Sequence, residues 1–119
     1  MQAELSPFPR PARSRRKSMS DHVRDAVQAL AGGHARFASH QERSWASVTF
    51  AGTRHRLELL FDGAEGVEAG DQFITALAEH EFAIPGQLVA DAGVMEVDHT
   101  LAPQPRLAVA IELLLLEDA

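Results

Sequence analysis

Histidines and carboxylates are the residues best suited to chemistry in this chain, because cysteine and tyrosine are both absent. His80-Glu81 begins like the helical zinc-protease motif, in which a second histidine follows one turn later. Ile84 stands in that place, directly before a proline that would break the helix. A metal site would need ligands from another segment, such as Asp98 or His99. We therefore favour unpaired surface histidines and expect no metal.

The same four side chains, His80, Glu81, Asp98 and His99, form the candidate catalytic set. A histidine could act as a base near neutral pH while a carboxylate orients it, provided that the four converge on one concave site. No Gly-x-Ser-x-Gly segment occurs, so a hydrolase-type serine is not supported. The sequence leaves catalysis open, leans toward a non-enzymatic protein and implies no cofactor.

One cluster of glycines and one cluster of arginines could each bind an anion, but each also has a structural explanation. The glycines at positions 63, 66 and 70 match neither the dinucleotide-binding fingerprint nor the P-loop, and nearby carboxylates would repel phosphate. We expect them to serve turns and helix ends. Arg54 and Arg56, on either side of a histidine, could bind an anion, or could equally pair with carboxylates across a solvated sheet face. The available partners are Glu58, Glu96 and Glu112.

The first 18 residues form a basic segment that we expect to be disordered, because it combines prolines, serines and arginines without an apolar period. It lacks the apolar core of a secretory signal. Its basic cluster could bind nucleic acid or acidic lipid. It could also be a solvated tail, or an extension upstream of a start at Met19. The cluster consists of Arg13, Arg15, Arg16 and Lys17.

Charge separates this tail from the body. The chain carries a net charge of -6, and residues 1–17 contribute +4, so the rest sums to -10 (-6 minus +4). An acidic body argues against nucleic acid and anionic membranes as partners. No apolar run approaches the ~20 residues that a membrane helix needs. Together with the absence of cysteine, these features favour a cytoplasmic location.

Two helices are expected. Ser20 can cap a helix over residues 21–31, which Gly32 and Gly33 would end. A second helix is expected over 65–79, where Gly70 costs about 1 kcal/mol relative to alanine. Residues 84–87 then suit a type II turn. The apolar stripes are Val23, Ala26, Val27 and Leu30 in the first helix and Val67, Phe73, Ile74 and Leu77 in the second.

A hairpin is expected between the helices. Residues 45–51 alternate in polarity, residues 51–53 form a compact turn with Gly52 available for a positive φ, and residues 55–61 form the return strand. That strand places Leu57, Leu59 and Phe61 on one face. Residues 34–40 alternate weakly and could form a short edge strand.

The strand expected over 88–98 has a conflict of parity. Asp91 and Glu96 are both polar but fall on opposite faces of a regular strand. A one-residue bulge near Gly93 would resolve the conflict, and a regular ladder through Gly93 would refute it. The bulge places Leu88, Ala90, Ala92, Met95 and Val97 inward and Asp91, Val94, Glu96 and Asp98 outward.

The last expected strand, over 107–116, is apolar on both faces. One parity carries Leu107, Val109, Ile111, Leu113 and Leu115, and the other carries two alanines, a glutamate and two leucines. Such a strand belongs in the middle of a sheet. Its second face needs a cover, which another copy of the protein could supply.

These elements predict one α+β domain over residues 19–119. We expect a two-layer sandwich in which both helices cover one face of an antiparallel sheet of four to five strands, in the order α-(β)-ββ-α-ββ. The open face would carry the interface of a homodimer. Its expected residues are Trp45, Leu60, Leu114 and Leu116, although Trp45 could equally be ordinary core.

The favoured function is therefore a small non-enzymatic binding module whose ligand and further partner the sequence does not identify. The segment 80–91 resembles small bacterial proteins to which no activity is attached. That resemblance adds nothing about function.

Overall fold

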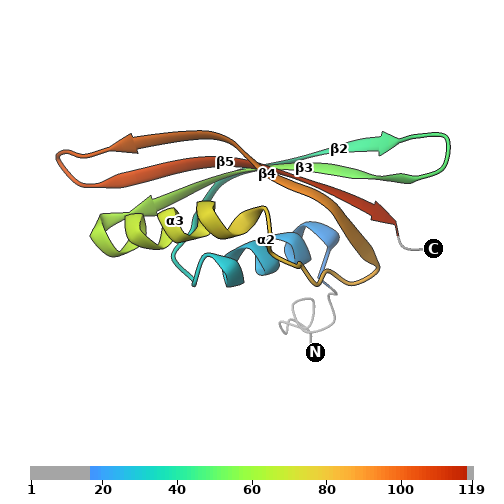
Figure 1. Ribbon diagram of the computed structural model, residues 1–119, viewed down its shortest axis with the longest axis horizontal. Coiled ribbons are helices and arrows are strands. Elements are labelled where there is room, and N and C mark those ends of the chain that lie inside the picture. The colour runs from blue at the N-terminus through green and yellow to red at the C-terminus, as the bar shows by residue number, and fades with distance from the viewer. Residues whose placement is uncertain (1–16, 118–119) are drawn as a thin grey trace, which may run out of the picture.

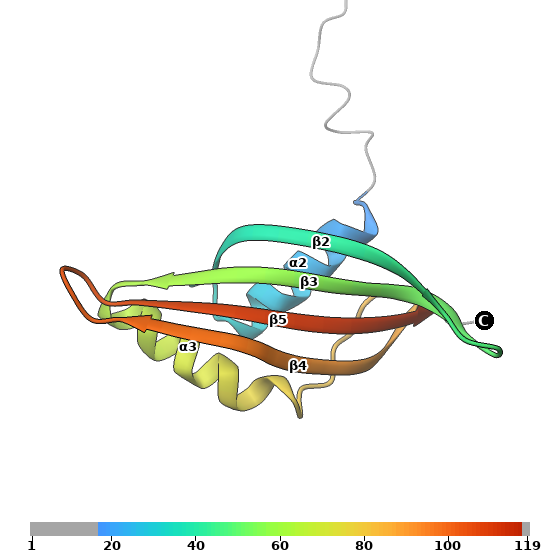
Figure 2. The same cartoon turned by 90° about the horizontal axis from the view of Figure 1, so that it is seen from above.

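The computed structural model describes residues 17–117 and shows two helices and four strands. The strands form one antiparallel sheet in the order β2-β3-β5-β4. Both helices lie on one face of the sheet (Figure 1), and seen from above the other face carries no helix (Figure 2). The predicted α+β sandwich is confirmed, with four strands. The elements are α2 (Met19–Leu30), β2 (Arg36–Ala46), β3 (Ala51–Asp62), α3 (Gly63–Leu77), β4 (Gln87–Thr100) and β5 (Arg106–Glu117).

The core lies between the helices and the sheet. β5 supplies every second residue from Leu107 to Leu115, and each of these side chains is at most 2% exposed. Because β5 lies between β3 and β4, the prediction that this apolar strand is central is confirmed. Burying one such side chain stabilises the fold by roughly 1.5–3 kcal/mol. The neighbouring elements add Leu57, Leu59, Phe61, Val23, Val27, Phe73 and Leu77.

The N-terminus of α2 differs from its prediction. Ser18 is the N-cap: its hydroxyl accepts a hydrogen bond from the Asp21 amide, and the Asp21 carboxylate accepts one from the Ser18 amide. Ser20, the predicted cap, instead donates its hydroxyl to Glu42 on β2. Residues 32–33 both have a positive φ and end the helix as predicted. Among residues 17–117, neither helix has the length and hydropathy to cross a membrane.

Gly70 in α3 has a packing role that the sequence did not reveal. A Cβ at this position would lie 2.8 Å from a methyl carbon of Leu107 and 2.9 Å from the ring of Phe61. The glycine therefore loses about 1 kcal/mol of helix propensity and in return lets α3 approach the sheet closely. α3 begins at Gly63 rather than at the predicted residue 65.

The predicted turn of the first hairpin was wrong. β2 continues to Ala46, and the turn comprises residues 47–50, where the Ser47 amide donates to the Phe50 carbonyl at 2.8 Å. The Ser47 hydroxyl in turn accepts a hydrogen bond from the Phe50 amide at 3.1 Å. Gly52 lies in β3, where a Cβ would come within 1.9 Å of the Leu115 carbonyl oxygen. The short strand expected over 34–40 thus extends through Ala46 as β2, whereas most of the strand expected over 45–51 is the turn.

The turn before β4 matches its prediction. Gly86 has a φ of 73°, and the Gln87 amide donates to the Ile84 carbonyl at 3.1 Å. A positive φ at the third position is the requirement of a type II turn, which glycine meets without strain.

The predicted bulge at Gly93 was also wrong, because the ladder through Gly93 is regular. The register shifts instead at two other places, between Val89 and Asp91 and between Val94 and Glu96. Only the second shift lies between Asp91 and Glu96, and it brings both acids to the same face, so the parity conflict is resolved by a bulge at a different position.

These two shifts change which side chains of β4 face the helices. Val94 pairs with Ile111 on the helix side, although it was predicted outward. Leu88 pairs with Leu116 on the uncovered face, and Met95 is 52% exposed, although both were predicted inward. The inward positions of Ala92 and Val97 and the outward positions of Asp91, Glu96 and Asp98 agree with the prediction.

Candidate functional site

The structure does not bring the predicted catalytic residues together. Asp98 and His99 are neighbours in β4 and face opposite sides of the sheet. The ring of His80 contacts Phe82 edge-on, with centroids 4.6 Å apart, and Glu81 is exposed. None of the four belongs to a three-residue group of potential metal ligands within residues 17–117. The enzyme hypothesis built on these residues therefore lacks a shared site.

A different polar cluster lies under the sheet, between α2 and the first two strands. His40 and Glu42 come from β2 and His55 comes from β3, where the register pairs Glu42 with His55. Candidate ligand atoms of the three residues all lie within 4.8 Å of one another. His55 is completely buried, which is unusual for a titratable side chain.

Hydrogen bonds link this cluster into a chain with one direction. Arg24 Nη1 lies 2.8 Å from His40 Nδ1, and arginine can only donate, so Nδ1 must accept. His40 Nε2 then carries the proton and donates to His55 Nδ1 at 2.9 Å. His55 Nε2 donates in turn to the Thr53 hydroxyl at 2.9 Å. Every ring nitrogen has a partner when both histidines are neutral.

The surroundings favour that neutral state. Burial is the main cause that lowers the pKa of His40 below 6.5, with His55 and Arg24 lowering it further. Burial also lowers the pKa of His55. Glu42 acts in the opposite direction on both rings but does not reverse the shift.

The hydrogen-bond chain does not fit a resident metal ion. A metal bound at His40 Nε2 would force the ring proton to Nδ1, where it would point at the donor groups of Arg24. The bond to His55 Nδ1 would also be lost, because a metal would have to occupy the space between two nitrogens already 2.9 Å apart. The proximity of His40 and His55 is therefore explained by the hydrogen bond between them, and Glu42 lies beside them because the register places it opposite His55.

This cluster attaches α2 to the sheet. Arg24 is held in place by Asp21 at 2.7 Å, and the Ser20 hydroxyl donates to Glu42. At the other end of the helix, the Gln28 amide group makes two hydrogen bonds to the backbone of Ala35, at 2.7 and 2.9 Å. The hollows of the described surface at residues 30–72, 38–110, 41–112 and 62–106 are lined by neither histidine of the pair. The arrangement is suited to holding a helix.

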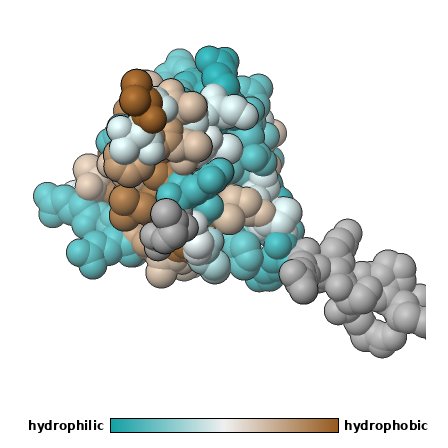
Figure 3. Space-filling model, turned by 90° about the vertical axis from the view of Figure 1, so that its right-hand side faces the viewer, coloured by the Kyte–Doolittle hydropathy of each residue, from teal (hydrophilic) through white to brown (hydrophobic). Residues whose placement is uncertain are grey.

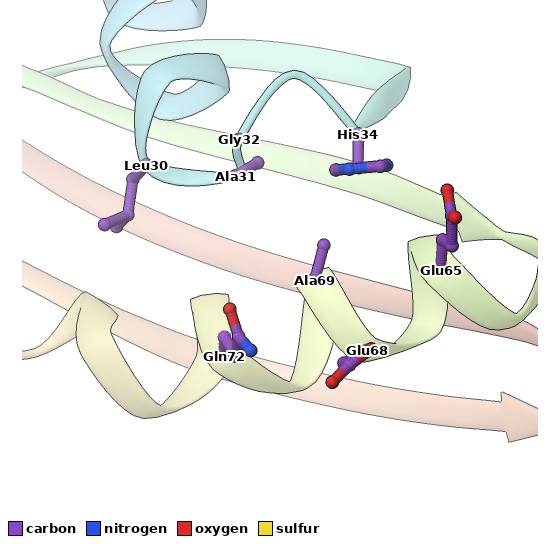
Figure 4. A pocket seen from close by; sticks show the side chains of 8 residues that line it. All are labelled: Leu30, Ala31, Gly32, His34, Glu65, Glu68, Ala69 and Gln72. Atoms are coloured by element: carbon purple, nitrogen blue, oxygen red, sulfur yellow. The ribbon is translucent and has the colours of Figure 1, made fainter.

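The groove between the two helices is another candidate, with a volume of about 470 Å³. Leu30 and His34 line one side, and Glu65, Glu68 and Gln72 of α3 line the other (Figure 4). The polar side chains here are solvent-exposed and lie on an open surface. The groove contains no buried polar group that would indicate a ligand.

The uncovered face of the sheet carries a network of ion pairs at its centre. Arg54 lies 3.4 Å from Glu112, and Arg56 lies 3.8 Å from Glu112 and 3.9 Å from Glu96. Of the two interpretations left open for these arginines, the contacts therefore support pairing across a sheet face. His55, between them in sequence, points to the opposite side.

Apolar side chains surround this network. Trp45, Leu60 and Leu114 are half-buried and Leu116 is 8% exposed, and all four lie on the uncovered face as expected. Leu88 adds a 59% exposed side chain opposite Leu116. Figure 3 looks onto the end of the molecule where the β2–β3 hairpin lies, and shows hydrophobic surface gathered there beside hydrophilic surface.

The histidine cluster was not recognised in the sequence because the predicted turn was misplaced. A turn at residues 51–53 leaves Glu42 and His40 outside the hairpin. With the turn at residues 47–50, the register brings Glu42 opposite His55 and His40 opposite Leu57. The signal that could have found the cluster is the alternation of polar residues in β2 once the strand is continued through residues 36–46.

Comparison with known proteins gives information on the fold alone. No protein-family model matches the sequence, and no curated protein sequence matches it. A solved structure described as the virion of a native gene transfer agent particle contains a similar chain, with a TM-score of 0.53 and 12% sequence identity. The match covers 83% of this chain and 92% of that chain. The two chains therefore share an arrangement of elements over nearly their whole lengths.

Proposed function

We propose that this protein is a non-enzymatic interaction module that associates with a second copy of itself through the uncovered sheet face. The observation that carries the proposal is the position of β5. This central strand is apolar on one side and largely apolar on the other, yet the helices cover only one of them. The other side presents Leu114 and Leu116 beside Trp45 and Leu60.

The size of the face is adequate for a stable dimer. Its shortest strand has 11 residues, which at about 3.3 Å per residue and about 4.8 Å between four strands gives a footprint of roughly 700 Å². Stable interfaces bury about 800 Å² of accessible surface on each partner. A rough protein surface has more accessible area than its flat footprint, so the face can meet this requirement.

The structural comparison supports an assembly role over catalysis. The similar solved chain belongs to a gene transfer agent particle. A protein whose function is association needs a surface and no active site, which agrees with the dispersed positions of His80, Asp98 and His99. A cytoplasmic location remains part of the proposal.

Replacing Leu60 and Leu114 by lysine tests the proposal. Each substitution places a charge on the uncovered face, where burial in an interface without a partner is costly. Leu101→Lys is the matched control, because Leu101 is 74% exposed and lies outside the strands, in the loop between β4 and β5. Analytical ultracentrifugation at micromolar concentration should show a dimer for the wild type and for Leu101→Lys, and a folded monomer for Leu60→Lys/Leu114→Lys.

A wild-type protein that is monomeric at these concentrations would contradict the proposal. A dimer that survives the double substitution but is lost in Leu101→Lys would place the interface at the hairpin tip instead. Circular dichroism of each variant separates loss of association from loss of folding.

A further inference from the structure

The uncovered face is divided by charge into two halves. The half formed by β2 and β3 presents four arginines and two acids, whereas the half formed by β5 and β4 presents four acids and one arginine. Residues opposite one another in the register share a face, which fixes this assignment. The basic set is Arg36, Arg43, Arg54 and Arg56 against Glu58 and Asp62, and the acidic set is Asp91, Glu96, Asp98 and Glu112 against Arg106.

Contacts within the chain pair most of these charges, and among residues 17–117 the members of the two sets left without an ion pair are Arg43, Glu58, Asp91 and Asp98. The centre is satisfied by the pairs of Arg54 and Arg56, and one end by Asp62, which accepts hydrogen bonds from Arg36 and Arg106. Within residues 17–117, Arg43 on edge strand β2 and Asp91 on edge strand β4 have no ion-pair partner.

Arg43 is also placed against a like charge. It lies directly opposite Arg54 in the β2–β3 ladder, an arrangement that is destabilising in an isolated sheet. We call a line of residues that are paired across the four strands a row of the sheet. The row of Arg43 and Arg54 continues through Leu114 on β5 to Asp91 on β4. One row of the sheet thus begins with an unpaired arginine and ends with an unpaired aspartate.

We propose that two copies pack face to face about a two-fold axis that runs parallel to the strands, so that β2 of one copy lies over β4 of the other. This inference rests on the proposed function, because it specifies the geometry of the same interface. Rotation about such an axis exchanges the two edges of the sheet and keeps each row in place. The basic half of each copy then covers the acidic half of its partner.

This geometry gives the edge charges the partners that they lack within one chain. Arg43 of each copy lies over Asp91 of the other, at both ends of the row. In the adjacent row, Trp45 lies over Leu88, which is 59% exposed in the single chain. Face-to-face sheets pack with their strands within about 30° of each other, which is compatible with these neighbours.

The same axis brings an apolar side chain to a hollow. A depression of about 200 Å³ lies over the small side chains of Ala108 and Ala110. Leu60 occupies the same row as Ala108, so the rotation places Leu60 of one copy over this depression in the other.

A two-fold axis across the strands would give the opposite electrostatics. It places β2 over β2 and β4 over β4, so that arginines face arginines and aspartates face aspartates. Like-charge contacts across an interface are strongly unfavourable. The division of charge therefore selects one of the two in-plane axes.

Charge reversal at the two edges distinguishes the axes. Arg43→Glu alone should place Glu over Asp91 twice in the dimer and weaken association about tenfold or more, and Asp91→Lys alone should do the same by placing Arg43 over Lys. The double variant Arg43→Glu/Asp91→Lys should restore the dissociation constant to within about threefold of wild type. An equimolar mixture of the two single variants should form heterodimers, because both contacts are then between opposite charges.

Sedimentation equilibrium and native mass spectrometry measure these outcomes, with Asp71→Lys on the exposed surface of α3 as a control that should leave the dissociation constant unchanged. Tighter association of Arg43→Glu would overturn the proposed axis and favour the one across the strands. A wild-type dimer that is insensitive to both single substitutions, Arg43→Glu and Asp91→Lys, would also overturn the axis while the proposed function stands. A monomeric wild type would remove both.

Discussion

At the scale of single residues, the chain from Arg24 through His40 and His55 to Thr53 shows how one half-buried and one buried histidine are kept neutral. Each ring nitrogen has a partner whose role as donor or acceptor is fixed by Arg24 at one end. A second proton on either ring would leave two donors facing each other. The cluster thus connects α2 to β2 and β3 through hydrogen bonds that depend on protonation state.

Stability should consequently fall as the pH falls through the range in which unfolded histidine titrates. The pKa values of His40 and His55 are lowered in the folded state, so the unfolded chain binds more protons just below its own pKa of about 6.5. The free energy of unfolding should then decrease from pH 7 toward pH 5, by at most about 1.4 kcal/mol per pH unit for each histidine.

Urea denaturation at a series of pH values measures this slope, and an NMR titration of the two imidazole signals identifies its source. Glu42, Asp21 and Arg24 are the charged groups nearest the pair. Midpoints above 6.5 for both rings would contradict the predicted direction.

At the scale of elements, glycines determine how closely backbone segments approach. Gly52 in β3 and Gly93 in β4 both lie on the uncovered face, but their surroundings differ. A Cβ on Gly52 would lie 1.9 Å from the Leu115 carbonyl oxygen, whereas a Cβ on Gly93 would have no atom within 4 Å. The first glycine is required by the packing of β3 against β5, and the second is not.

Alanine substitution should separate these two glycines. Gly52→Ala should lower the free energy of unfolding by about 2–3 kcal/mol or more, because the backbone of β5 would have to move. Gly93→Ala should be neutral or stabilising by up to about 1 kcal/mol, since alanine reduces the freedom of the unfolded chain. Thermal or urea denaturation of both variants measures the difference, and equal effects would show that the β3–β5 contact tolerates a side chain.

At the scale of the whole molecule, the two layers leave a sheet face that contains a hydrophobic row, a neutral ion-pair network and unpaired charges at its edges. The unpaired charges at the edges, Arg43 and Asp91, contribute no ion pair within a monomer. In the proposed dimer, each feature has a counterpart on the partner. Folding and association would then be coupled, because binding of a second copy stabilises the folded state.

The melting temperature should therefore rise with protein concentration. Scanning calorimetry from about 1 to 100 μM should show this increase for the wild type, because dissociation accompanies unfolding. Leu60→Lys/Leu114→Lys should melt at a temperature that is independent of concentration. A concentration-independent wild type would indicate that association, if present, does not contribute to folding.

The sequence alone determined the class of fold, both helices and the central position of β5. These features depend on local periodicity and on the amount of apolar surface, which the order of residues specifies directly: alternating apolar residues at 107–115 need cover on one side, and the stripes of the helices supply it.

Tertiary structure alone decided the register of β2, the two shifts in β4 and the meeting of His40 with His55. The Ser47 turn contains no glycine that would mark it, and the choice between one bulge and two depends on how β4 pairs along the whole length of β5. A register is a property of two strands at once, so a displaced turn transfers every polar side chain to a new neighbour. For that reason the histidine cluster seen in the structure differs from the catalytic set that the sequence had indicated.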